Sequence, residues 1–204
     1  MSTMTAQPET LANSADARRA MIDSQLRTSG VNEEFVLARM LAVPREDYLP
    51  DEKKALAYID RSIALGADAH LCSPLFYGKL LIEADPRADD SVLIIEGGTG
   101  YLADLVRPLV GEVDTISVAD AADPAKAPAK TYSLVLVDGA IEELPPHLAN
   151  SLAEGGRIVG GLLLRKVTRL ASGRKVAGTV SLLPVEDLGI PVLHAFDKPK
   201  GWTF

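Results

Sequence analysis

The segment "VLIIEGGTGYLADL" has the residue types and spacing of a turn that binds a nucleotide-like cofactor. A branched apolar run enters a turn containing Gly97, Gly98 and Gly100, and a helix-like stretch follows. Glycine suits such a turn because the missing Cβ lets a cofactor approach the backbone and the helix N-terminus. Glu96 stands where the first glycine is usual, and it adds bulk and negative charge there. The motif therefore predicts a cofactor turn that has been altered.

A second group of reactive residue types lies in "HLCSPLF", where Cys72 and Ser73 follow His70. A cysteine beside a histidine suggests a thiol nucleophile, but the sequence shows no third group to orient the histidine. We favour Cys72 as a small buried apolar residue. One cysteine excludes an intramolecular disulfide and a zinc site built from several thiolates. Since the other histidines, His147 and His194, are distant in sequence, we expect no metal site.

The elements that must position these residues alternate from Ser91 onward. Apolar runs such as "SVLIIE", "YSLVLVD" and "RIVGGLLL" predict strands that are covered on both faces, and "YLADLVRPLV" and "PPHLANSLAEGG" predict helices between them. This order predicts a doubly wound α/β sheet. The segment "VTRLASGRKVAGTVSLL" predicts a hairpin that turns at Ser172–Gly173, and "PVLHAF" predicts a last strand, so antiparallel strands complete the sheet.

The front of the chain has a different character. We expect residues 1–13 to be flexible and residues 14–204 to form one domain, with a helical cap over 14–90 and a sheet core over 91–204. No internal repeat is visible. With 204 residues, the chain is long enough for one ordinary domain with a well-buried core.

Capping residues predict where the helices of this cap begin. Ser14 is placed to cap a helix from about Ala15 to Ser29, and Asn32 to cap the next one. Pro74 suits the first position of a third helix, which we expect to run to about Ala84.

Composition limits the classes of partner. The net charge is −7, and an acidic surface repels phosphate backbones, so we expect no nucleic-acid partner. The basic residues of the predicted hairpin alternate with apolar ones, as on a solvated face. No run of about 18 apolar residues exists, so we expect no membrane span. The N-terminus lacks the apolar core of a signal peptide, and we expect a cytoplasmic protein.

Three longer segments carry a family resemblance. "RRAMIDSQLRTSGVNEEFVLARMLAVPREDYLP" resembles the N-terminal signature of the protein-L-isoaspartate O-methyltransferase family, and "AYIDRSIALG" resembles the segment that follows it. "YSLVLVDGAIEELPPHLANSLAEGGRIV" is similar to a later strand, proline-led helix and Gly-Gly-Arg turn. The resemblance covers most of the chain from Arg18 to Val192.

The resemblance implies a Rossmann-like fold that uses S-adenosylmethionine. It implies methylation of the side-chain carboxyl of isoaspartyl residues, so that the partners would be aged proteins or peptides. The methyl ester then cyclises to a succinimide, which reopens partly to aspartate. Because the sulfonium is already electrophilic and the acceptor carboxylate already ionised, such an enzyme acts mainly by positioning the two.

The family pattern also assigns cofactor positions to this chain. These are Glu96, Gly97, Gly98, Gly100, Ser117 and Asp120. Ile94 stands where the family has an acid, and Glu96 either replaces that acid by a shift of two residues or fills the pocket; we favour the second interpretation. Ser117 takes the place of an acid that binds both ribose hydroxyls, which one hydroxyl cannot do equally well. Asp120 and Asp123, just downstream, either substitute for it or are ordinary loop acids; we favour the second interpretation.

The positions that the resemblance places beside the methyl-accepting substrate also differ from the family pattern. Cys72 takes the place of the family's serine beside the transferred methyl group, and Ser73 the place of its glutamine, so both are assigned catalytic roles by resemblance. The resemblance and the fold assign Asp60, Pro74 and Asp138 to substrate binding. For Asp138, a turn-forming Asp-Gly pair is the alternative.

The segment "EVDTISV" predicts a further strand, and its connection to the strand "YSLVLVD" is short. The family has a helix, a strand and an adenine-side loop there, whereas this chain has only "ADAADPAKAPAKT", residues 119–131. Its prolines favour an extended crossover. We therefore expect the sheet to lack one edge strand, together with the adenine-side wall.

Two functions remain open at this point. One is an active isoaspartyl methyltransferase, which the fold and the N-terminal signature favour. The other is a non-catalytic relative with a degenerate cofactor site, acting as an interaction module and self-associating through the sheet edge that the deletion exposes. Proline and lysine in the crossover would block that edge, so the sequence alone does not decide between them.

Overall fold

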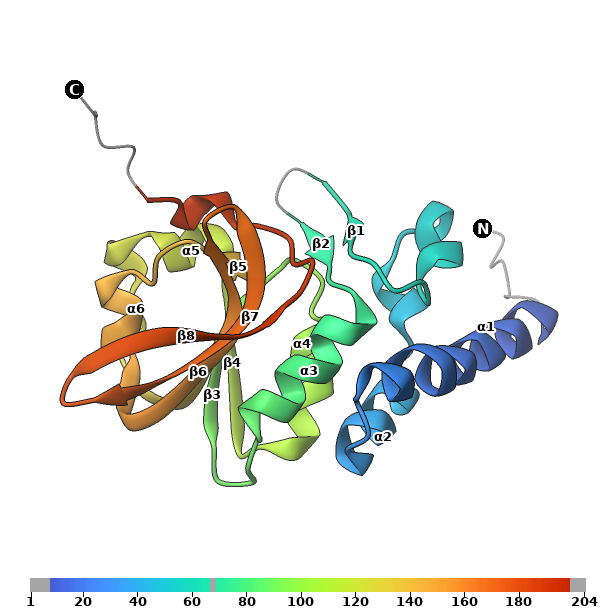
Figure 1. The fold of residues 1–204 in the computed structure, drawn as a ribbon, viewed down its shortest axis with the longest axis horizontal. Helices are drawn as coiled ribbons and strands as arrows, with labels where there is room; N and C mark the ends of the chain where they lie inside the picture. Colours follow the sequence, from blue (N-terminus) through green and yellow to red (C-terminus); the bar gives the residue numbers. More distant parts are fainter. Residues whose placement is uncertain (1–7, 67–68, 199–204) are drawn as a thin grey trace, which may run out of the picture.

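The computed structural model describes residues 8–66 and 69–198, with side chains from residue 14 onward. A six-stranded sheet runs through the molecule in the order β4-β3-β5-β6-β7-β8 (Figure 1). Its strands are β3 (Ser91–Glu96), β4 (Glu112–Ser117), β5 (Tyr132–Ile141), β6 (Leu152–Leu164), β7 (Val167–Val176) and β8 (Thr179–Asp187). The first four strands are parallel, and β7 and β8 are antiparallel additions. The predicted fold class is confirmed, including the antiparallel strands near the C-terminus.

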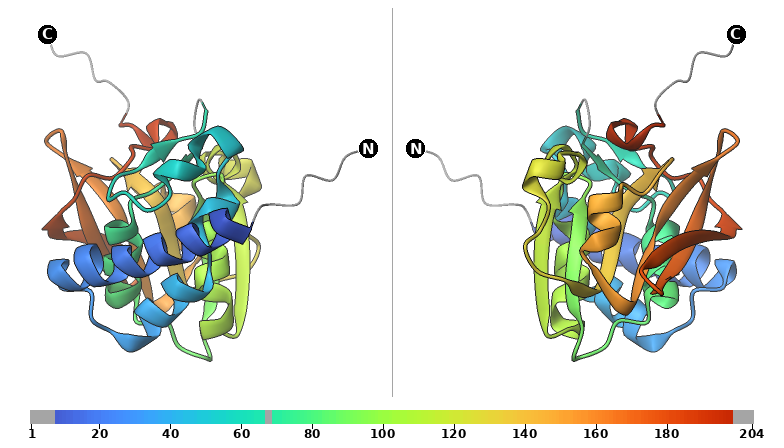
Figure 2. Two further views of the ribbon diagram at one scale, coloured as in Figure 1. Left: turned by 90° about the vertical axis from the view of Figure 1, so that its right-hand side faces the viewer. Right: turned by 90° about the vertical axis from the view of Figure 1, so that its left-hand side faces the viewer.

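Both faces of the parallel strands are buried, as their nearly continuous apolar sequences predict. Alternate residues point to opposite sides of a strand, so Ile94 of β3 and Leu136 of β5 face one core, whereas Ile95 and Val137 face the other. The first core contains the N-terminal helices, and the second lies under short helices from the later part of the chain (Figure 2). The sheet is therefore the middle layer of three.

The helices differ in length between these layers. On one side lie α1 (Pro8–Met21), α2 (Glu34–Ala42), α3 (Pro74–Ala84) and α4 (Tyr101–Val106). On the other side lie α5 (Val118–Ala122), α6 (Pro146–Asn150) and the 3-10 turn His194–Phe196. Two short strands, β1 (Ile63–Ala64) and β2 (His70–Leu71), pair with each other in the segment before α3. No helix in residues 8–66 and 69–198 is long and apolar enough to cross a membrane.

Two predicted helix starts in the cap are wrong. The first helix begins at Pro8 rather than Ala15, because proline at the first helical position favours an earlier start. The Ser14 hydroxyl donates to Glu46 instead of capping. Glu33, not Asn32, is the residue that precedes α2, and its side chain makes no cap. The start of α3 is as predicted, with Pro74 at its first position.

The predicted hairpin turn is also wrong. Ser172 and Gly173 lie within β7, and the chain turns at Ala177–Gly178, where both residues have positive φ of 49° and 78°. Two-residue hairpin turns need left-handed backbone, and the glycine supplies this at one of the two positions. Arg165 and Lys166 form the corresponding turn between β6 and β7. The basic residues of this region thus lie either in that turn or on β7.

The C-terminal segment does not form the expected strand. Val192 makes a single parallel bridge to Ala140, and a 3-10 turn follows. Leu193 and Phe196 are buried against the second core. A Cβ on Gly139 would lie 2.7 Å from the Leu193 side chain, so the absence of a side chain at Gly139 makes room for this segment. The segment therefore acts as a cover over the end of β5.

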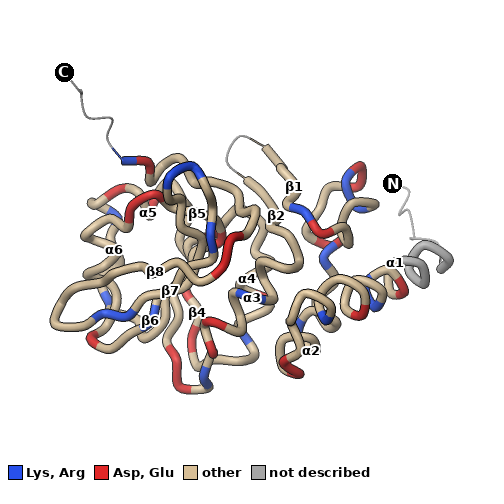
Figure 3. The backbone as a smooth tube through the Cα atoms, viewed as in Figure 1, with Lys and Arg blue, Asp and Glu red and all other residues tan. Residues whose placement is uncertain are grey.

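The crossover of residues 119–131 is only partly extended, because α5 and a 3-10 turn at Pro124–Lys126 form within it. No strand lies beyond β4 in the part of the chain described, as predicted. Lys130 forms ion pairs with Glu112 and Asp114 of this edge strand, at 2.6 and 2.7 Å. Acidic and basic residues are interspersed along the backbone (Figure 3). The free edge is thus charged and partly covered by the crossover.

Candidate functional site

The glycine turn begins where β3 ends at Glu96. The Glu96 carboxylate accepts a hydrogen bond of 2.8 Å from the backbone N–H of Gly100 through Oε2. Its Oε1 is buried and has no hydrogen-bond partner. Burial, followed by the charge of Asp138, raises the pKa of Glu96 to about 7. Glu96 therefore ties the turn to its own strand and keeps one unpaired oxygen.

Residues of the chain itself lie against the first two glycines. The backbone N–H of His70 donates to the carbonyl of Gly97 at 2.9 Å. A Cβ on Gly97 would lie 2.8 Å from the His70 ring, and one on Gly98 would lie 2.9 Å from Ala69. By contrast, nothing lies within 4 Å of the Cβ direction of Gly100. The first two glycines are needed for close packing of the chain, and only the third faces open space.

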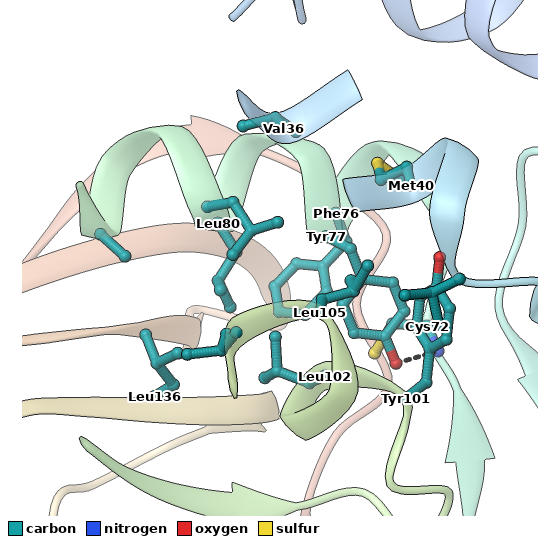
Figure 4. Close-up of a cluster of buried hydrophobic side chains, with 14 of the residues drawn as sticks. Val36, Met40, Cys72, Phe76, Tyr77, Leu80, Tyr101, Leu102, Leu105 and Leu136 are labelled. Atoms are coloured by element: carbon teal, nitrogen blue, oxygen red, sulfur yellow. Dashed lines mark hydrogen bonds between the residues drawn. The ribbon is translucent and has the colours of Figure 1, made fainter. Parts of the chain in front are cut away.

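A buried polar cluster lies behind this turn, centred on Asp138 of β5. Tyr77 of α3 donates its hydroxyl hydrogen to Asp138 Oδ2 at 3.3 Å and accepts the N–H of Cys72 at 3.1 Å. Figure 4 shows the Tyr77 ring beside Tyr101 and Cys72. Asp138 Oδ1 has no partner, and burial raises the pKa of Asp138 to about 6. The Asp138 side chain is thus fully buried, and the structure gives it no turn-forming role.

The structure supplies the third group that the sequence does not show beside Cys72 and His70. His70 Nε2 lies 2.9 Å from the backbone oxygen of Asp138. Burial, and then the charge of Asp138, raises the pKa of the Cys72 thiol well above its usual range, and burial lowers the pKa of His70. A reactive cysteine needs the opposite shift. This geometry holds a neutral, fully buried thiol, which agrees with Cys72 as a buried apolar residue.

Sequence reasoning gave no role to Arg45, which is fully buried beneath this cluster. Its guanidinium donates to the carbonyls of Ala57 and Cys72 at 2.8 and 2.7 Å and lies over the rings of Tyr77 and Tyr101. The available signal was an arginine directly after Pro44, in the short segment "PREDYLP" between two prolines. Arg45 fixes the backbone of Cys72 against the cap.

The other residues predicted on the acceptor side are placed at the start of α3. Ser73 accepts the N–H of Phe76 at 3.2 Å as the helix cap, and Pro74 follows it. Asp60 is exposed, and its carboxylate lies 3.4 Å from the N–H of Leu75. These three residues therefore shape the beginning of α3. Asp60 and Ser73 thus contact the first turn of α3 rather than the buried cluster around Asp138.

The predicted ribose-side residues are also occupied by local structure. The Ser117 hydroxyl accepts the N–H of Asp120 at 3.1 Å and caps α5. Asp120 forms an ion pair with Lys126, and both are solvent-exposed. Ser117 lies beside Glu96, as its register partner on the adjacent strand β4. The structure thus brings these two predicted residues together, but the Ser117 and Asp120 side chains make local contacts and do not line the cavity at this edge of the sheet.

A cavity of about 550 Å³ opens at the carboxyl end of the parallel strands. It lies between the segment that leads into β2, the start of α5 and the C-terminal cover. The lining residues are Ala64, Gly66, Ala69, His70, Val118, Ala119 and residues 191–195. The carboxyl ends of β3, β4 and β5 meet here, at the point where the strand order reverses, which is the usual ligand position in such sheets. Among the residues that the structure describes, the lining is mostly apolar and contains no carboxylate.

Comparisons with known proteins agree with this architecture. A sequence model of the family described as "Protein-L-isoaspartate(D-aspartate) O-methyltransferase (PCMT)" matches residues 16–123. A protein-L-isoaspartate O-methyltransferase of Methanoculleus marisnigri is 27% identical over 91% of this chain and 93% of its own length. One of Methanoregula boonei is 30% identical over 76% and 84%. The chain belongs to the protein-L-isoaspartate O-methyltransferase family.

A solved structure supports the fold independently. It is a Plasmodium falciparum protein described by the same family name, in complex with S-adenosyl-L-homocysteine. At 16% sequence identity it superposes with a TM-score of 0.68 and covers 88% of this chain and 97% of its own. Family membership and the Rossmann-like fold are thus confirmed, and S-adenosylmethionine is the cofactor at the level of the family.

The cavity is the part of this chain that fits such a cofactor. Its volume lies within the range of small-molecule pockets, and its place at the carboxyl edge is that of a cofactor. The unpaired oxygens of Glu96 and Asp138 are buried outside this lining, so their charge would act on a cationic ligand from outside the cavity. Val118, Ala119 and the C-terminal cover wall this cavity beside the short crossover, and the loss of the family's adenine-side wall stays a prediction. The fit rests on shape and charge more than on ribose hydrogen bonds.

Proposed function

We propose that this chain transfers a methyl group from S-adenosylmethionine to the side-chain carboxyl of an isoaspartyl residue in a protein or peptide. Family membership supports the reaction class. The observation that carries the proposal for this chain is the cavity at the carboxyl edge, which is open beside the glycine turn and walled by α5 and the C-terminal cover. Loss of the ribose acid predicts weak cofactor binding, since each missing hydrogen bond weakens it by about 1–3 kcal/mol.

The residues have separate tasks in this proposal. Val118, Ala119 and Leu193 would hold the adenosine by apolar contact, and Glu96 would favour the positive end of the cofactor. The cofactor supplies an electrophilic methyl group when bound. The chain then has to align the acceptor carboxylate with that group and exclude water, so positioning is its main contribution. Cys72 and Asp138 lie behind the turn and act on the alignment through His70 and Gly97.

A thermal shift titration tests the cofactor step. Saturating S-adenosylmethionine should raise the melting temperature, because a ligand that binds only the native state stabilises it. Ala119→Trp should remove this shift by filling the cavity, since Ala119 is an exposed lining residue. Ala125→Trp is the matched control on the same crossover, away from the cavity. Methanol release from an isoaspartyl peptide then tests the reaction. No shift at millimolar cofactor would contradict the proposal.

One observation favours a second candidate function, a non-catalytic relative. Gly97 and Gly98 are packed against His70 and Ala69, and Ser117 is used as a helix cap. Under this alternative, Glu96→Gly should restore cofactor binding that the natural chain lacks. Equal or weaker binding by Glu96→Gly would instead favour the first function. Self-association through β4 receives no support from its edge, because Lys130 pairs with the acids there.

The finer expectations about context stay predictions. They are a cytoplasmic location, the absence of a nucleic-acid partner and self-association. Analytical ultracentrifugation across a range of protein concentrations measures the last of these directly.

A further inference from the structure

Three ligand types meet in one buried place behind the glycine turn. His70 of β2, Cys72 before α3 and Asp138 of β5 each present a ligand atom, and these atoms lie within 4.8 Å of one another. All three residues are buried, with Cys72 and Asp138 fully so. They come from segments separated by up to 68 positions in the chain. The fold, rather than any local motif, assembles this set.

The cluster has an unmet electrostatic need. Asp138 Oδ1 is buried without a hydrogen-bond partner, and so is Glu96 Oε1 on the neighbouring strand. Arg45, the buried cation beneath the cluster, donates to the carbonyls of Ala57 and Cys72 rather than to either carboxylate, and its own Nη1 has no partner. A buried carboxylate is normally paired or bound to a metal. A small cation at this place would therefore satisfy the free oxygen of Asp138.

We propose that His70, Cys72 and Asp138 form a binding site for one zinc ion. A thiolate, an imidazole and a carboxylate are the ligand types that zinc takes in proteins. With one charge on Cys72 and one on Asp138, the set neutralises a divalent ion. Three protein ligands leave the fourth position of a tetrahedral ion for water or a ligand. This proposal does not rest on methyl transfer, because metal binding is tested without any cofactor.

The surrounding contacts already orient the three ligands. His70 Nε2 faces the backbone oxygen of Asp138 at 2.9 Å, so Nε2 carries the ring proton and Nδ1 carries the lone pair. The Tyr77 hydroxyl holds the Asp138 carboxylate through Oδ2. Hydrogen bonds of this kind orient metal ligands in known sites. Atoms bound to tetrahedral zinc lie roughly 3.5 Å apart, so the cluster needs to contract by about 1 Å.

A metal ion can reach the cluster through the cavity, and the Cys72 thiol has to lose its proton when the ion binds. His70 lines the cavity of about 550 Å³, which leads from solvent to the cluster. Zinc displaces the proton of the Cys72 thiol as the sulfur–zinc bond forms, and the proton leaves to solvent. Metal binding should therefore release protons and weaken as the pH falls.

Cobalt(II) is the sharpest probe, because Cys72 is the only cysteine in the chain. Any thiolate-to-cobalt charge-transfer band therefore reports on Cys72 alone. The full chain, without a polyhistidine tag, should bind about one cobalt or zinc ion, show that band, and melt at a higher temperature with zinc than with a chelator. Zinc should displace cobalt and bleach the band. A cobalt spectrum without the band, or an unchanged melting temperature in excess zinc, would overturn the proposal.

Variants separate this site from adventitious metal binding. Cys72→Ser keeps a small group that hydrogen-bonds, so it should fold, lose the band and bind zinc at least 10-fold more weakly. His194→Gln is the matched control, because His194 lines the same cavity but is exposed and paired with Asp197; it should bind like the natural chain. Equal zinc affinity in Cys72→Ser would place the ion elsewhere and contradict the proposal.

Discussion

Two buried aspartates at opposite ends of the parallel strands show how differently the edges of this sheet are built. Asp90, just before β3, is held by Arg157 and Ser133 at 2.6 Å each and by the N–H of Arg87 at 2.8 Å. These bonds lower the pKa of Asp90 despite the opposing effect of burial. Asp138, near the carboxyl ends of the strands, has one unpaired oxygen and a raised pKa.

The difference separates a stabilising edge from a functional one. Fully paired acids contribute to folding, whereas perturbed and incompletely paired acids gather where ligands bind. Glu96 follows the pattern of Asp138, with a pKa raised to about 7 and one free oxygen. The amino-terminal edge therefore holds the sheet together, and the carboxyl-terminal edge is left open to interaction.

The largest effect is expected at the stabilising edge. Asp90→Ala should lower the free energy of unfolding by about 3–5 kcal/mol, because it leaves the largely buried charge of Arg157 without its carboxylate, with only carbonyl partners. Urea denaturation measures this. Asp89→Ala is the control, since Asp89 is the exposed neighbour and should change stability by less than about 0.5 kcal/mol. A small effect of Asp90→Ala would remove the contrast between the edges.

The next effect is a gain at the open edge. Ser117→Asp should bind S-adenosylmethionine about 10-fold more tightly, because a carboxylate accepts both ribose hydroxyls. Stability should stay the same, since aspartate caps a helix as well as serine. Isothermal titration calorimetry measures the affinity. Ser117→Ala is the control, and it should lose the cap of α5 without any gain in affinity. Unchanged binding by Ser117→Asp would place the ribose elsewhere.

Glu96 should give the open edge a distinct pH dependence. Its pKa rises from 4.5 to about 7 on folding, so the native state binds more protons than the unfolded state between these values. Stability therefore falls as the pH rises from about 4.5 to about 7. Glu96→Gln should flatten that slope in chelator-treated protein, as measured by urea denaturation at several pH values. An equal slope in Glu96→Gln would show that another group carries it.

How much the sequence predicts depends on whether a feature is local. The buried strands and the start of α3 follow from apolar periodicity and from Ser73–Pro74, and both appear as expected. The hairpin turn was misplaced because Ser172–Gly173 resembles a turn, whereas pairing with β6 and β8 keeps it extended. Predicting that Glu96 ties the turn to Gly100 would have required the backbone geometry of the turn.

The cluster behind the turn lies beyond local reasoning altogether. His70 and Cys72 are visible as neighbours, but Asp138 joins them only because β5 and β3 are parallel and adjacent. Arg45 is similar, since its partners are carbonyls of Ala57 and Cys72 that no side-chain pattern reveals. Ser117 shows the reverse case. It stands where the family has the ribose-binding acid, but here its side chain caps α5.

The smallest effect should come from the counterpart of Asp90 at the open edge. Asp138→Asn, in metal-free protein, should change the free energy of unfolding by less than about 1 kcal/mol, although Asp138 is the more deeply buried of the two. The amide keeps an acceptor for Tyr77 and removes a buried charge that lacks full pairing. Urea denaturation of Asp138→Asn beside Asp90→Asn compares the edges with the same chemical change. A loss at Asp138 as large as that at Asp90 would mean that the carboxyl edge also holds the fold together, and the division between the edges would fail.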